Sequence, residues 1–329
     1  MSNPRLTTAL SNGALVLQTE GRIAVLRPSV DLDLGDLPKE RLHLIQGFRP
    51  DFETFEAMGF DVAVAPEGRY GSSIVCMTRS KAEARALLAQ ARAMTDGPII
   101  VDGQKTDGIE SMLRDIKKRT PIGEVISKSH GKLFAFEGGD FTDWAANPDG
   151  QQVADGFVTR SGVFSADGVD RGSALLAQAL PEKLPKRIAD LGAGWGYLSR
   201  AILERAGVEH LHLVEAEHAA LDCARQNITD PRAQFHWLDA RQFRTTFPLD
   251  AVIMNPPFHT SRAAEPNIGR AFIAAAAAML SQRGQVWLVA NRHLPYEAEA
   301  AAHFLEVEEI AGDRSFKVLL AAKPRRTRR

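Results

Sequence analysis

The sequence predicts an α/β protein in which a doubly wound, mostly parallel sheet with an antiparallel edge strand is preceded by a second α/β domain. Two observations indicate this fold. From Lys186 onward, short apolar runs alternate with helical patterns, as they do in repeated βα units. Near the C-terminus, a tight connection at Gly312 and Asp313 joins two apolar runs, and so short a connection can join only antiparallel neighbours.

Seven apolar runs supply the predicted strands of the C-terminal half, at residues 187–191, 211–214, 234–238, 250–254, 285–290, 304–310 and 316–322. Helical patterns follow the first two runs, and an alanine-rich helix at 271–280 follows the fourth. Gly284 is expected to close that helix. The carboxyl ends of parallel strands meet at one edge of a sheet, so the residues that follow these strands should line a common crevice.

The N-terminal half has its own apolar strands, at 42–46, 61–65, 74–77 and 98–101, and a helix at Lys81–Met94. Phe60–Pro66 resembles Leu249–Pro256, which predicts an internal duplication, although strings this short can also match by chance. The N-terminal copy lacks a Gly-x-Gly-x-Gly turn and an Asn-Pro-Pro string, so we expect it to have no cofactor site. Glycine and polar residues cluster between Gly138 and Val158, and this linker predicts domains at 1–145 and 146–329.

The charge balance limits which partners the chain can attract. Forty Lys and Arg stand against 41 Asp and Glu, so a polyanion would have to meet a local basic patch. The candidate patches are Lys117–Arg119, the pair Lys128 and Lys132, and the C-terminal run Lys323–Arg329. Taken alone, each patch is more often an ordinary solvated face.

Cysteine content and hydropathy bear on metal sites and location. Cys76 and Cys223 form no Cys-x-x-Cys pair, so neither a disulfide framework nor a metal site is expected. No apolar run approaches the roughly 20 residues needed to cross a bilayer. We therefore expect a cytoplasmic protein without membrane contact, present as a monomer or weak oligomer.

A glycine-rich turn follows the first strand of the C-terminal half. Such a turn lets backbone amides approach a nucleotide-like ligand closely, here those of Gly192, Ala193, Gly194 and Gly196. Its spacing differs from the dinucleotide pattern Gly-x-Gly-x-x-Gly. Asp190 lies two residues before the first glycine and suits a ligand with an ammonium group, such as the methionine part of S-adenosylmethionine. The alternative is a purely structural strand-to-helix turn.

Acidic residues also follow the next two strands. Glu215 is expected to accept hydrogen bonds from the ribose hydroxyls, with Glu217 as a weaker candidate. Asp239 is expected to accept from the adenine amino group, and Ala240 to offer its backbone amide to the ring. Taken singly, such acids are more often solvated loop residues. Together with the glycine turn they predict one cofactor crevice.

Asn255-Pro256-Pro257-Phe258, after the fourth strand, is the most specific string in the chain. The lone pair of an exocyclic base amine is delocalised, so the nitrogen must be held by acceptors before it can attack. The Asn255 side-chain oxygen and the Pro256 carbonyl can each accept one N–H, Pro257 stiffens the turn, and Phe258 can stack on the base. His259 is expected to have a positioning or structural role. The alternative is an ordinary Asn-Pro turn.

These motifs identify a family resemblance. The region from about Gly156 to Ala322 resembles the bacterial small-subunit ribosomal RNA guanine-N2 methyltransferases, with their large-subunit paralogues close behind. The resemblance is carried by Gly162–Ser165, Asp167–Asp170, Gly172-Ser173, Asp190–Gly194, Asn255–His259, Val289–Asn291 and Leu294–Tyr296. It implies a seven-stranded Rossmann-like methyltransferase sheet after a degenerate methyltransferase-like domain that recognises RNA. It also implies S-adenosylmethionine as cofactor and ribosomal RNA or the small subunit as partner, with Phe164 and Asp170 near the cofactor's methionine end.

Departures and rival functions remain at this point. Trp195 and Tyr197 stand where smaller residues are usual, and Thr260–Ile268 differs from the usual pattern of the family. The rival enzymes are N6-adenine methyltransferases, release-factor glutamine methyltransferases, which usually carry Tyr at the position of Phe258, and nucleotide-dependent oxidoreductases. The rival without catalysis is a ribosome assembly factor that keeps the fold.

Overall fold

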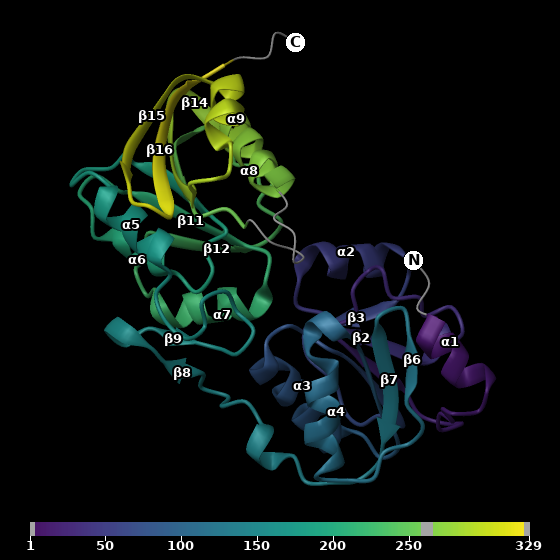
Figure 1. Ribbon diagram of the computed structural model, residues 1–329. Coiled ribbons are helices and arrows are strands. Elements are labelled where there is room, and N and C mark those ends of the chain that lie inside the picture. Colours follow the sequence, from purple (N-terminus) through teal and green to yellow (C-terminus); the bar gives the residue numbers. More distant parts are fainter. Residues whose placement is uncertain (1–3, 258–265, 326–329) are drawn as a thin grey trace. The chain divides into compact units, whose positions relative to one another are not determined.

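The computed structural model describes residues 4–257 and 266–325 (Figure 1). Its contacts divide the chain into two compact units, Met1–Gly150 and Gln151–Arg329, so the division falls within the polar stretch 138–158. We call them the N-terminal and the C-terminal unit. In the described ranges, no helix is both long enough and apolar enough to span a membrane.

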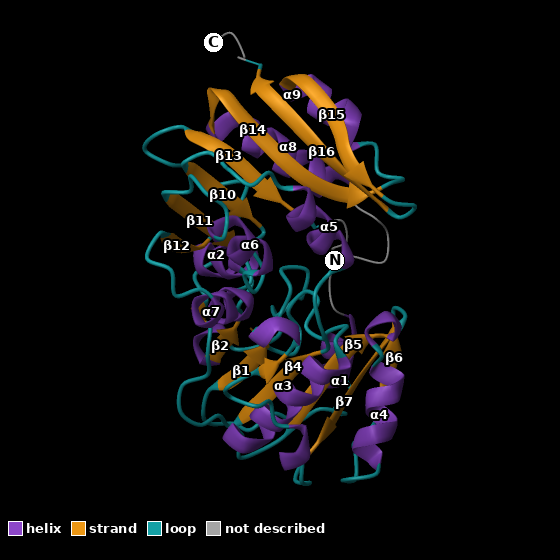
Figure 2. Ribbon diagram, turned by 90° about the vertical axis from the view of Figure 1, so that its left-hand side faces the viewer, coloured by secondary structure: helices purple, strands orange, loops and turns teal. Residues whose placement is uncertain are grey.

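The C-terminal unit contains a seven-stranded sheet of order β12-β11-β10-β13-β14-β16-β15. Pairing is parallel from β12 to β14 and antiparallel at β16 and β15, which confirms the predicted fold class (Figure 2). The strands are β10 (Arg187–Leu191), β11 (His210–Glu215), β12 (Ala233–Trp237), β13 (Leu249–Met254), β14 (Leu280–Asn291), β15 (Phe304–Gly312) and β16 (Phe316–Pro324). A short hairpin of β8 (Gln151–Gln152) and β9 (Val158–Thr159) precedes them.

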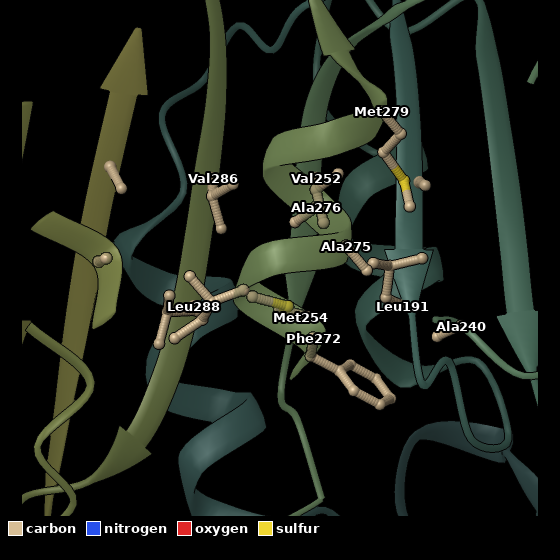
Figure 3. Close-up of a cluster of buried hydrophobic side chains, with 14 of the residues drawn as sticks. Leu191, Ala240, Val252, Met254, Phe272, Ala275, Ala276, Met279, Val286 and Leu288 are labelled. Atoms are coloured by element: carbon tan, nitrogen blue, oxygen red, sulfur yellow. The ribbon is translucent and has the colours of Figure 1, made fainter. Parts of the chain in front are cut away.

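Helices cover both faces of this sheet because successive residues of a strand point to opposite sides. Val252 and Met254 of β13 pack in one cluster with Phe272 of α8 (Figure 3). Ala251 and Ile253 pack in the other cluster, which α6 shares. The helices are α5 (Arg171–Ala179), α6 (Tyr197–Leu203), α7 (His218–Asn227), α8 (Pro266–Met279) and α9 (Tyr296–His303).

One predicted boundary in this unit is wrong. Gly284 does not close the alanine-rich helix, because α8 ends at Met279 and β14 begins at Leu280. The strand register shifts here, since Leu249 pairs with Leu280 whereas Ala251 pairs with Gln285. Gly284 lies inside this irregularity, where an added Cβ would come within 2.7 Å of the Leu280 side chain. Gly284 is therefore required by the irregularity in β14 and does not end a helix.

The N-terminal unit repeats the same arrangement, with a sheet of order β3-β2-β1-β4-β5-β7-β6. Its strands are β1 (Ile23–Leu26), β2 (Leu42–Ile45), β3 (Asp61–Ala63), β4 (Ser72–Cys76), β5 (Ile99–Gln104), β6 (Ile126–Lys128) and β7 (Gly131–Phe136). Its helices are α1 (Pro4–Ser11), α2 (Arg49–Ala57), α3 (Lys81–Met94) and α4 (Ile109–Lys117). The corresponding register pairs are Leu26–Ile45 with Leu191–Val214, and Leu26–Val75 with Leu191–Met254.

This topology corrects the string match on which the duplication was predicted. Phe60–Pro66 contains the edge strand β3, whose position in the sheet corresponds to β12. Leu249–Pro256 contains β13, and its counterpart is β4, which lies three positions from β3 in the N-terminal sheet, with β2 and β1 between them. Both strings place an Asp before an apolar run that ends near a proline, and this local pattern carries no information on strand order.

Candidate active site

The glycine turn links β10 to α6. Gly192, Gly194 and Gly196 have φ of 75°, 56° and 93°, a region that suits glycine. A Cβ on Gly194 would meet nothing within 4 Å, so this residue opens onto free space. A Cβ on Gly196 would lie 3.2 Å from Ile228, next to α7. Gly196 is therefore required by helix packing, whereas Gly194 leaves room for a ligand.

Asp190 lies beneath this turn and is fully buried. Ser199 Oγ donates to its Oδ2 at 2.7 Å, and its Oδ1 has no hydrogen-bond partner within the described ranges. Burial raises the pKa of the carboxyl to about 7. A buried carboxylate oxygen without a donor is costly, and an ammonium group would satisfy it. The site thus fits the amino end of the expected cofactor.

Glu215, at the end of β11, fixes the backbone of the turn. Its Oε2 accepts from the Gly194 amide at 2.8 Å, and its Oε1 accepts from the Glu217 amide at 2.7 Å. Burial raises the pKa of this carboxyl as well. Each oxygen keeps a second lone pair, so hydroxyl donors can still be accepted. Glu217 itself is the N-cap of α7.

Asp239 and Ala240 follow β12 and are both buried. The Asp239 carboxylate is held by Arg241, with Nη2 at 2.5 Å from Oδ2, and it also accepts from the Arg241 amide at 2.8 Å. The Arg241 side chain is about half exposed. A base amine would therefore share this acid with the guanidinium.

Asn255 lies at the end of β13, and its amide orientation is fixed. Its Nδ2 donates to Asp170 Oδ2 and to Ser173 Oγ, both at 2.9 Å. Asp170 in turn caps α5 by accepting from the Ser173 amide at 2.8 Å. Both N–H groups of the Asn255 amide are used, so Oδ1 is the atom left to accept a hydrogen bond from a substrate.

One pocket brings together five of the predicted catalytic and cofactor-binding residues, namely Phe164, Gly192, Ala193, Gly194 and Asn255. Its walls include Phe164, Asp170, Ser173, Asn255 and the turn residues 192–195. Ser165, Tyr197 and Leu198, which were not predicted as site residues, complete it. Asp190, Gly196, Glu215, Asp239, Ala240, Pro256 and Pro257 do not line it. Pro256 is buried and Pro257 exposed, whereas Phe258 and His259 lie outside the described residues.

Trp195, unusual at its position, anchors the segment that carries Phe164. Its Nε1 donates to the Phe164 carbonyl oxygen at 3.0 Å, and its ring meets Phe157 edge-on with the centroids 4.9 Å apart. The Phe164 side chain remains 56% exposed. The segment is thus fixed by its backbone while the aromatic ring stays available to a ligand.

Besides Ser165, Tyr197 and Leu198, the structure adds Ser173 and Ser199 to the site, since their hydroxyls contact Asn255 and Asp190. The Asp170-x-x-Ser173 spacing is a helix N-cap signal, so Ser173 could have been placed near Asp170. No sequence signal links Ser199 to Asp190. Over residues 4–257 and 266–325, no three His, Cys, Asp or Glu side chains are grouped to hold a metal ion.

Comparisons with known proteins agree with this arrangement. A relative from Shewanella sp. strain MR-4, ribosomal RNA small subunit methyltransferase C, is 29% identical over 268 residues, which is 77% of each chain. Ribosomal RNA large subunit methyltransferase G of Ectopseudomonas mendocina is 33% identical over 171 residues, covering 50% of this chain and 46% of its own length.

Among solved structures, the T. thermophilus 16S rRNA N2 G1207 methyltransferase in complex with AdoMet and guanosine is similar to this chain. The TM-score is 0.78 at 24% identity, over 94% of this chain and 90% of the other, so the two share a fold. Residues 155–320, about half of the chain, match the family named methyltransferase small domain. They contain the glycine turn, the buried acids and the oriented Asn255, and the chain belongs to the methyltransferase small domain family.

Proposed function

We propose that the protein transfers the methyl group of S-adenosylmethionine to the exocyclic N2 amine of a guanine in ribosomal RNA, most directly in the small subunit. The observation that carries the proposal is the Asn255 amide, whose two N–H groups are bound so that Oδ1 is left for a substrate donor. Supporting it, the relatives that span most of the chain are named small-subunit ribosomal RNA methyltransferases.

The cofactor would be held by groups around the glycine turn. Asp190 Oδ1 accepts from the ammonium group, Glu215 from the ribose hydroxyls, and Asp239 from the adenine amine. The backbone at Gly194 opens the space, and Phe164 lies on the segment beside it. When bound, S-adenosylmethionine supplies an electrophilic methyl group on a sulfonium.

Asn255 and Pro256 would act on the substrate. Asn255 Oδ1 and the Pro256 carbonyl each accept one N–H of the amine, which holds the nitrogen and directs its lone pair into the pocket. Phe258 would stack on the extruded base. The methylated nitrogen loses its extra proton to water, so no side chain has to act as a base. The rate gain comes mainly from alignment.

We further propose that residues 1–145 form a degenerate domain that recognises RNA and that residues 146–329 form the catalytic domain. On this proposal the protein works in the cytoplasm as a monomer or weak oligomer. Titration calorimetry on two fragments, 1–145 and 146–329, tests the division. We expect a heat of cofactor binding from the second fragment and none from the first. Binding of the cofactor by the first fragment would show that the N-terminal domain is not a degenerate copy.

Tritiated methyl transfer tests the reaction. The full chain is incubated with labelled cofactor and with small or large ribosomal subunits that lack the modification, and the RNA is then digested to nucleosides. We expect label in N2-methylguanosine from the small subunit. Label in N6-methyladenosine or in a protein glutamine would overturn the substrate assignment, and an absence of label on every substrate would favour an assembly factor.

A further inference from the structure

A groove of about 330 Å³ lies in the N-terminal unit, and it is lined by residues at the carboxyl end of β5, in the hairpin of β6 and β7 and at the start of α4, four elements that Figure 2 labels. We call it the lysine groove. Its lining residues are Lys105, Ile109, Glu110, Ser127, Lys128, Ser129, His130, Gly131 and Lys132. The lining thus contains three lysines and one histidine but a single acidic residue.

The three lysines are unneutralised. Lys105 and Lys128 are exposed and Lys132 is half-buried, and none of them forms an ion pair within the described part of the chain. Lys128 Nζ reaches Thr8 Oγ1 at 3.4 Å, and Lys132 Nζ reaches Ser127 Oγ at 3.2 Å, both neutral acceptors. By contrast, in the cluster Lys117–Arg119, the Arg119 guanidinium is bound by Asp143 at 2.6 Å.

The position in the C-terminal unit that corresponds to Lys105 also carries a cation, but there an acidic side chain neutralises its charge. The Lys105 amide donates to the His130 carbonyl at 2.9 Å, and at the corresponding position the Arg292 amide donates to the Ser315 carbonyl at 2.8 Å. Arg292 is paired with Glu309 at 2.9 Å, whereas Lys105 forms no ion pair with any residue that the structure describes. The duplicated fold thus carries a cation at this point in both units, and the N-terminal one remains available to an external anion.

We propose that the lysine groove binds phosphate groups of the RNA backbone. The proposal rests on the RNA substrate proposed above and assigns the N-terminal unit a defined contact. Lysine ammonium groups and the hydroxyls of Ser127 and Ser129 are donors that phosphate oxygens accept. No Phe, Tyr or Trp lines the groove, so the contact is with the backbone and is independent of base sequence.

Fluorescence anisotropy with the full chain tests the groove. The probe is a labelled single-stranded RNA of about 16 nucleotides and mixed sequence, titrated between about 50 and 200 mM KCl. The variant is Lys105→Gln/Lys128→Gln/Lys132→Gln. The slope of log affinity against log salt should fall by about 0.7 for each lost phosphate contact, so by about two in the triple variant.

Two matched variants distinguish the loss of specific phosphate contacts in the groove from a general loss of positive charge. Replacing the same three lysines by arginine keeps the charge and should keep the slope. Replacing Lys81, Lys117 and Lys118 by glutamine removes the same charge elsewhere in the N-terminal unit and should leave the slope near that of the wild type. If the slope fell equally in the groove variant and in this control, phosphate binding by the lysine groove would be refuted. An unchanged slope in the groove variant would refute it as well.

Methyl transfer distinguishes this inference from the proposed function. In the groove variant, KM for the ribosomal substrate should rise while kcat and cofactor affinity stay within about twofold of the wild type, because the contact is remote from the reacting atoms. An unchanged KM with intact methylation would overturn the groove alone. A wild-type chain that neither binds nor methylates RNA would overturn both.

Discussion

The two units share a strand order but differ at each position where a ligand would be held. Gly192 follows β10 and Arg27 follows the corresponding strand β1, both with positive φ, 75° and 56°, and their amides donate to the carbonyl oxygens of Val214 and Ile45 at 2.9 and 2.8 Å. In the N-terminal unit the Arg27 side chain, bound to Gln46 at 3.2 Å, stands where Gly192 leaves space. The topology therefore persists without the residues that make a site.

The acids differ in the same way. Gln46 occupies the position of Glu215, and its Oε1 accepts from the Phe48 amide at 2.8 Å as Glu215 accepts from Glu217. Its Nε2 donates to the Pro28 carbonyl at 2.6 Å, so the amide is satisfied within the unit. The position of Asp190 is held by buried Val25. One unit thus keeps an unsatisfied acceptor for a ligand, and the other has removed it.

The largest expected effect concerns Asn255, whose counterpart by strand register is Cys76. Asn255→Ala removes an acceptor from a preorganised pair and should slow methyl transfer by about 10²-fold or more, as loss of an oxyanion-hole donor does elsewhere. Cofactor affinity should stay near wild type, and Asn255→Asp should be milder because a carboxylate still accepts. Cys76→Ala should leave turnover unchanged. Single-turnover assays with calorimetry measure both quantities, and loss of cofactor binding with normal chemistry would refute the assigned role.

The next effect compares Glu215→Ala with Gln46→Ala. A charged acceptor for ribose hydroxyls contributes about 1.5–3 kcal/mol, so Glu215→Ala should weaken cofactor binding about ten- to hundredfold. Gln46→Ala removes a buried amide of the other unit and should lower thermal stability while leaving the cofactor affinity unchanged. If both variants bound the cofactor equally weakly, the N-terminal unit would have to contribute to the site.

Asp190 gives a pH dependence that Val25 cannot give. Burial raises the pKa of the Asp190 carboxyl to about 7, so below that pH the free protein holds it neutral. An ammonium group binds the ionised form, hence cofactor affinity should fall about tenfold per pH unit below pH 7, and it should fall again above about pH 8, where the α-amino group of the cofactor loses its proton. Asp190→Asn should bind more weakly near neutral pH and lose the dependence on the acid side. Calorimetry at several pH values decides, and an identical pH profile in the variant would remove Asp190 from the cofactor site.

The sequence predicted most of the C-terminal fold because its strands are apolar runs, and four of them, β10 to β13, are followed within two residues by a glycine, an acid or Asn-Pro. It misaligned the repeat, since β1 is a run of four residues followed by Arg27 and Pro28 and not by a glycine turn. Asp190 and Asn255 were accessible to sequence reasoning because they mark strand ends. Ser173, which is 82 positions from Asn255, was not paired with it, because such a contact is created only by packing α5 against the sheet.

The first helix of each unit offers the smallest and most specific test. In the C-terminal unit α5 supplies Ser173 Oγ to the Asn255 amide, whereas in the N-terminal unit α1 supplies Arg5 to Asp102 at 2.6 Å. Ser173→Ala removes a hydrogen bond that orients the Asn255 amide. It should raise the activation free energy by about 1 kcal/mol, which lowers kcat about fivefold, and leave the cofactor affinity unchanged. In the background of Asn255→Ala the same substitution should cost nothing further, because the hydroxyl acts only through that amide. Full additivity of the two losses in single-turnover rates would show instead that Ser173 contacts the substrate or supports the fold independently.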